Sequence, residues 1–89
     1  LFDKYLEREG VGSYRTKLII KTKGLVEEIK VRDFLNSVGV TRTKLVAADM
    51  DKDANMMSFT YFVEGESRKI KKMPKGVFSH KWIKSLRLE

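Results

Sequence analysis

The chain contains no cysteine, one histidine and one proline in 89 residues. Without cysteine it has no disulfide, thiolate metal ligand or thiol nucleophile, and a reducing compartment suits it. The single histidine, His80, excludes a site built from several histidines, and neither a second base nor an orienting acid lies near it in sequence. We therefore predict no catalytic residue, cofactor or metal site, and we do not expect an enzyme.

Long apolar runs are also missing. Short runs such as Leu18–Ile20 and Tyr61–Val63 have the length of strands and fall far short of the ~20 residues that a membrane-spanning helix needs. The length suits one domain. We predict that residues 1–13 are an amphipathic lead-in followed by a glycine-containing linker, and that residues 14–89 form the domain. The chain starts without methionine, so we expect it to be a piece of a longer protein.

Two-residue alternation predicts a half-buried strand over residues 14–23, with Leu18 and Ile20 on the inner face. A helix is predicted over residues 25–38, followed by Gly39 as its cap. Its apolar stripe comprises Val31, Phe34, Leu35 and Val38, with support from Leu25 and Ile29.

The second half begins with a predicted hairpin. Its strands cover residues 40–50, with Leu45 and Ala47 opposite Val46 and Ala48, and residues 56–64; the turn at residues 51–55 joins them. A polar helix is predicted from residues 66–67 onward, with Pro74 and Gly76 ending or kinking it. A last strand is predicted over residues 81–88, with Trp82, Leu86 and Leu88 on one face.

This order, β-α-β-β-α-β, predicts an α+β domain of the ferredoxin-like plan. We expect an antiparallel four-stranded sheet with two helices on one face, a two-layer sandwich. Domains of this plan often pair edge to edge, so a homodimer is one expected assembly.

Charge is distributed unevenly along the chain. Residues 1–66 have eleven basic and eleven acidic side chains, whereas the remainder is almost purely basic and supplies the whole net charge of +7. Such asymmetry favours an anionic neighbour, although a solubilising surface without a partner explains it too. The predicted anion-binding or membrane-surface residues are Arg68, Lys69, Lys71, Lys72, Lys75, Lys81 and Lys84.

Aromatic side chains interrupt this basic stretch. Phe78 and Trp82 suit either a lipid headgroup boundary or stacking on nucleic-acid bases, while Trp82 equally suits closure of the core. A separate acidic group, Asp49, Asp51 and Asp53, is spaced like the start of a calcium loop. Ala54 and Thr60 occupy the positions where that loop needs glycine and a carboxylate, which favours a charged hairpin turn.

The segment from Tyr14 to Glu89 resembles the ACT-like cytosolic domain that ends MgtC/SapB-family membrane proteins, which are associated with magnesium transport and homeostasis. The resemblance is in the opening strand at residues 14–20, the hairpin around residues 49–55 and the closing segment at residues 82–88. It implies a non-catalytic regulatory or interaction domain on the cytoplasmic side of the bacterial inner membrane. Its partner would be the anionic membrane surface or an acidic protein. Pro74 departs from the family's longer second helix.

The alternative is a small basic RNA-binding module. The RNA-recognition motif has the same element order, and its third strand carries a basic-Gly-aromatic-small-aromatic run. The strand here keeps Phe59 and Tyr61 but lacks the basic residue and the glycine. On this reading Tyr61, Phe59 or Trp82 would stack on bases beside the same basic stretch.

Overall fold

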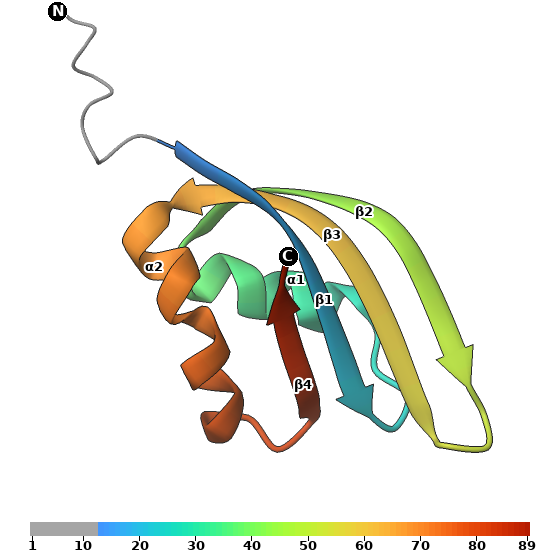
Figure 1. Cartoon of the computed structure of the whole chain (residues 1–89). Coiled ribbons are helices and arrows are strands. Elements are labelled where there is room, and N and C mark those ends of the chain that lie inside the picture. Colours follow the sequence, from blue (N-terminus) through green and yellow to red (C-terminus); the bar gives the residue numbers. More distant parts are fainter. Residues whose placement is uncertain (1–12) are drawn as a thin grey trace, which may run out of the picture.

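The computed structural model describes residues 13–89; the lead-in predicted for residues 1–13 lies, apart from Ser13, outside them. The elements follow in the predicted order (Figure 1). They are β1 (Ser13–Lys23), α1 (Glu28–Ser37), β2 (Val40–Asp51), β3 (Met56–Glu66), α2 (Ser67–Lys72), the 3-10 helix η2 (Met73–Ser79) and β4 (Ile83–Leu88).

The four strands form one open antiparallel sheet in the order β2-β3-β1-β4. Both helices pack on one side of it (Figure 1). The structure is thus α+β and compatible with the ferredoxin-like plan. Among residues 13–89, no helix is long and apolar enough to span a bilayer.

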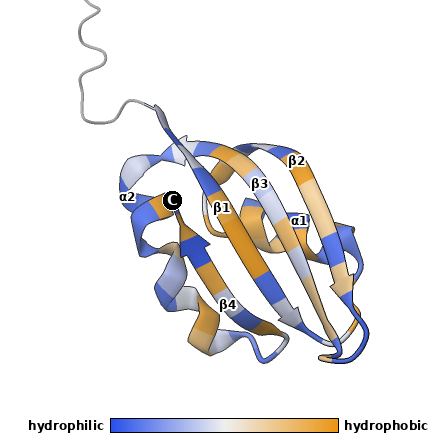
Figure 2. Ribbon diagram, turned by 45° about the vertical axis from the view of Figure 1, so that its right-hand side comes forward, coloured by the Kyte–Doolittle hydropathy of each residue, from blue (hydrophilic) through white to orange (hydrophobic). Residues whose placement is uncertain are grey.

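Alternating side chains of the two central strands face the helices and form the core. Leu18 and Ile20 of β1 pair in register with Tyr61 and Phe59 of β3, and all four are buried. Figure 2 shows the resulting apolar bands on the central strands. Burial of each such side chain contributes about 1.5–3 kcal/mol. The helix side adds Val31, Phe34, Leu35, Ile70 and Met73.

The first helix begins three residues later than predicted. Gly24 has a positive φ of 84°, and Glu27 is still extended, so Leu25 precedes the helix and is exposed. Ile29 is two residues before Val31, a rotation of about 200° around the helix, and it faces solvent. The predicted support from Leu25 and Ile29 is therefore wrong, whereas Val31, Phe34 and Leu35 are buried as expected.

Two β-bulges change the predicted strand faces. The register between β2 and β3 shifts between Leu45 and Ala47, so Leu45 shares a face with Ala48 rather than Ala47. In β4 a shift opposite Lys21 and Thr22 turns Ile83 into the core, and Trp82 lies just before the strand. The predicted pairing of Leu45 with Ala47 is wrong because a bulge adds one residue and reverses the alternation. Trp82, Leu86 and Leu88 all pack against the core, as predicted, and Ile83 joins them there.

Two glycines allow the corner before β2 to touch the end of β3. A Cβ atom on Gly65 would lie 2.6 Å from the Gly39 carbonyl oxygen. Gly39 has the predicted left-handed conformation, with φ +103°, and a Cβ atom there would lie 2.6 Å from Cδ of Lys69. This contact fixes the start of α2 against the sheet, with its basic side outward.

Candidate binding surfaces

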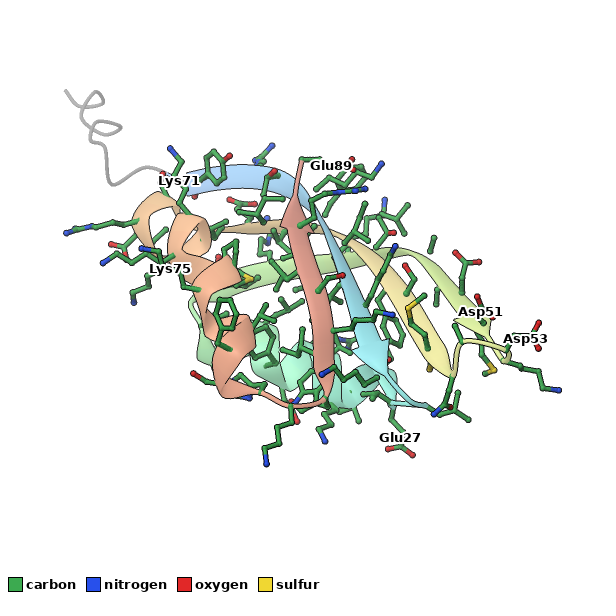
Figure 3. The ribbon with its side chains drawn as sticks, turned by 60° about the horizontal axis from the view of Figure 1, so that its bottom comes forward. Glu27, Asp51, Asp53, Lys71, Lys75 and Glu89 are labelled. Carbon is green, nitrogen blue, oxygen red and sulfur yellow. The ribbon has the colours of Figure 1, made fainter. Side chains whose placement is uncertain are left out.

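Four of the seven predicted anion-binding residues lie together on α2 and the start of η2. Arg68, Lys71, Lys72 and Lys75, with Ser67, line a shallow depression of about 400 Å³. Their spacing of three and four residues places them on one side of the helix, opposite buried Ile70. In Figure 3, Lys71 and Lys75 lie beside α2, at the end of the molecule away from Asp51 and Asp53.

An aromatic side chain continues this row. Side chains three residues apart eclipse each other in a 3-10 helix, so Lys75 and Phe78 of η2 follow Lys72 on one side. Phe78 is 93% exposed. The Lys71 ammonium is held 5.2 Å from the centroid of the Tyr14 ring. We call Arg68, Lys71, Lys72, Lys75 and Phe78 the α2 stripe.

The other three predicted residues are not part of the stripe. The Lys69 stem packs against Gly39, and its ammonium lies 3.7 Å from a Glu66 carboxylate oxygen. Lys81 is in the turn before β4, and Lys84 of β4 lines a different depression near Asn55. The seven predicted residues therefore do not form one continuous surface, because the turn into β4 carries the chain away from α2.

A second basic surface, which the sequence analysis missed, lies on the open face of the sheet. Phe62 of β3 is 52% exposed, and Lys17 and Lys44 are its register partners on the two neighbouring strands. Alternation along β3 is the signal that could have found it, because Phe62 must point away from buried Tyr61.

Further cations lie beside this phenylalanine. Glu64 is flanked by Arg15 and Arg42, and its carboxylate lies 3.4 Å from Nε of Arg15. A depression of about 590 Å³ runs over this part of the sheet. We call six of its lining residues the open-face site: Arg15, Lys17, Arg42, Lys44, Phe62 and Glu64.

The aromatics predicted to stack on bases lie elsewhere. Phe59 and Tyr61 are buried beneath the helices. Trp82 is half-buried and meets the Phe34 ring edge-on, with centroids 5.8 Å apart, which agrees with the core-closing alternative. His80 packs in the same cluster, 4.9 Å from the Phe34 ring.

Tyr61 is joined to α1 by a polar contact. Its hydroxyl donates a 2.6 Å hydrogen bond to Oε2 of Glu28, whose carboxylate also binds the Arg32 guanidinium at 2.8 Å. Burial raises the pKa of the Tyr61 phenol well above its ordinary value, and the hydrogen bond to Glu28 adds to the rise. The contact ties the start of α1 to the central strand.

The acidic segment forms the tip and one strand of the hairpin. The backbone N–H of Ala54 donates to Oδ1 of Asp51, and Asn55 has a positive φ of 51°, as expected of a charged turn. Asp49 and Asp51 belong to β2, and Asp53 lies in the turn. Within residues 13–89, no three His, Cys, Asp or Glu side chains are grouped as metal ligands.

Comparison with models of known protein families gives no match, and comparison with curated proteins gives none either.

Proposed function

We propose that this chain is a non-catalytic regulatory or interaction domain that binds the anionic surface of a membrane through the α2 stripe. The observation that supports this most is the convergence of four cations on one exposed side of α2 and η2, ending in Phe78. Each lysine or arginine near an anionic surface contributes about 1 kcal/mol, and Phe78 can enter the headgroup boundary.

The experiment is sedimentation with lipid vesicles of phosphatidylglycerol and phosphatidylcholine. Reversal of three stripe charges, Arg68→Glu, Lys71→Glu and Lys75→Glu, should lower binding at least ~100-fold, since about 3 kcal/mol is lost. Vesicles of phosphatidylcholine alone should bind neither the wild type nor this variant, because they have no net charge to attract the stripe.

A matched control variant has the same net charge as the stripe variant. Lys17→Glu, Lys21→Glu and Lys44→Glu also lower the net charge from +7 to +1, because three reversals remove six charges. This sheet variant should bind the vesicles much better than the stripe variant. Equal loss in both would mean that overall charge, rather than the stripe, attracts the lipid, and would remove the membrane proposal.

We further propose that the domain is ACT-like and belongs to the MgtC/SapB type, attached on the cytoplasmic side of a bacterial inner membrane protein linked to magnesium. The element order and the open sheet with both helices on one side support this. Titration of the amide NMR spectrum with Mg²⁺ tests the sensing role. Saturable shifts confined to one region support it, and a spectrum that stays unchanged rejects it.

A second function, binding of single-stranded RNA, is favoured by one observation: Phe62 is exposed on the open face between Lys17 and Lys44. An aromatic ring among cations suits a base stacked over it with its phosphates held on either side. On this proposal the stacking residue is Phe62 rather than Phe59, Tyr61 or Trp82.

The RNA proposal is tested by binding of a short labelled RNA at low salt. Phe62→Ala should weaken binding about fivefold or more, because a base–aromatic stack contributes about 1–3 kcal/mol. Phe78→Ala is the matched control and should leave RNA binding unchanged. The absence of any complex for the wild type at ~50 mM salt would eliminate this function.

A further inference from the structure

The β2 strand is a long edge of the sheet. It spans twelve residues, pairs only with β3 among the described elements, and is exposed along almost all of its length. An edge strand presents unpaired N–H and C=O groups that another strand can bind. Leu45, Val46 and Met50 on it are 40%, 49% and 53% exposed.

Charges along β2 are separated by sign. Its first half contains Arg42 and Lys44, its last part contains Asp49 and Asp51, and the segment between them, Leu45–Ala48, is apolar. Charges on an edge usually discourage pairing. Here, however, an antiparallel copy of the same strand would place its acidic end beside the basic end, so the strand is complementary to itself.

The bulge between Leu45 and Ala47 places the acidic and the basic side chains of β2 on the same face of the sheet, as this antiparallel pairing requires. Arg42 and Lys44 pair with Glu64 and Phe62 on the open face, before the shift in register. Asp49 and Asp51 pair with Ser58 and Met56 after the shift, on the same open face. Without the bulge, an odd separation in sequence would place the acids and the bases on opposite faces.

We propose that two copies of this chain associate through β2, antiparallel, about a two-fold axis between Val46 and Ala47. In this register Arg42 faces Asp51 of the second copy, and Lys44 faces its Asp49. On the helix side Leu45 faces Ala48, and Thr43 faces Met50. By symmetry each pairing occurs twice, and the two sheets join into one with the open faces on the same side.

The test is sedimentation equilibrium of the wild type and of two complementary variants. One variant, Arg42→Asp with Lys44→Asp, has only acids on β2; the other, Asp49→Lys with Asp51→Lys, has only bases. The wild type should dimerise, and each variant alone should bind itself at least ~10-fold more weakly, since like charges now face each other. An equimolar mixture of the two should recover the dimer.

The recovered heterodimer separates the proposal from misfolding, since unfolded variants would not complement each other. Far-UV circular dichroism checks the fold of each variant. Lys81→Asp with Lys84→Asp is the matched control for Arg42→Asp with Lys44→Asp. It lowers the net charge equally, but near the opposite edge strand, β4, and should leave the dimer intact. A monomeric wild type, a mixture that stays monomeric, or an equal loss in the control would overturn the proposal.

Discussion

Removal of one hydroxyl group at Tyr61 should lower stability measurably. Tyr61→Phe deletes the donor of the 2.6 Å hydrogen bond to Glu28 while keeping the ring, which is fully buried. The bond joins the central strand β3 to the first turn of α1. We expect its loss to reduce the free energy of unfolding and to loosen the start of the helix.

The magnitude follows from the partners that Glu28 keeps. A hydrogen bond to a charged acceptor contributes about 1.5–3 kcal/mol. In the variant, the Glu28 carboxylate retains both contacts with Arg32, at 2.8 and 3.2 Å, and its side chain is 27% exposed to water. It is therefore not left unsatisfied, and we expect a loss near the lower limit, about 1.5 kcal/mol at neutral pH.

The same pair predicts a dependence on pH. In the unfolded chain the phenol loses its proton near its ordinary pKa of 10.0, whereas the raised pKa in the folded protein keeps the proton bound. The unfolded state then binds fewer protons, so the free energy of unfolding falls as pH rises above 10.0. Tyr61→Phe lacks this contribution, so the advantage of the wild type should shrink in alkaline solution.

Urea unfolding followed by Trp82 fluorescence measures both effects, and phenolate absorbance of the folded protein reports the titration directly. Glu28→Gln separates charge from geometry, because the amide still accepts a hydrogen bond; it should cost less than Tyr61→Phe. The reasoning is refuted if Tyr61→Phe is as stable as the wild type at neutral pH, or if their difference does not change in alkaline solution.

The other predictions concern core packing and a buried hydrogen bond, and the two packing substitutions each have a control substitution. Gly65→Ala should destabilise by about 1–3 kcal/mol, because its Cβ atom would meet the Gly39 carbonyl at 2.6 Å. Gly76→Ala, which has no atom within 4 Å of the new Cβ, should be neutral or stabilise by up to ~1 kcal/mol in the same urea assay. Thr22→Val should cost about 1–3 kcal/mol, because the buried hydroxyl donates to the Gly24 carbonyl and accepts from the Met57 N–H; amide exchange at Met57 should accelerate. Ile70→Ala should cost about 2–5 kcal/mol, whereas Phe78→Ala should change stability by less than ~0.5 kcal/mol and weaken only vesicle binding.

The strands and helices could be predicted from the sequence because the spacing of apolar side chains along an element depends only on residues close together in the chain. The two-residue period that contains Leu18 and Ile20, and the spacing of Val31, Phe34 and Leu35, each place apolar groups on one side of their element. The glycine at position 39 was predictable too, since a helix commonly ends in a left-handed residue. Of the candidate sites, the basic face of α2 was predictable from the spacing of Arg68, Lys71, Lys72 and Lys75.

The rest depended on contacts between distant segments. A β-bulge cannot be recognised from the hydropathy of neighbouring residues. The bulge in β2 nevertheless reversed the predicted faces beyond Leu45, and the bulge in β4 moved Ile83 rather than Lys84 into the core. On β3, Phe59 and Tyr61 were the predicted stacking residues, and Phe62 was not among them. Only the position of the helices decided that Phe62 is the exposed one.

The sequence by itself thus determined the elements, their order and the inner residues of the central strands, because these follow from backbone geometry and from burial of apolar side chains. The tertiary structure decided which surfaces are open. It separated Lys69, Lys81 and Lys84 from the α2 stripe, assembled the open-face site from three strands, and left β2 at an edge with its charges on one face. The physical reason is that strand pairing and helix docking bring together residues far apart in the chain, and no local pattern encodes those distances.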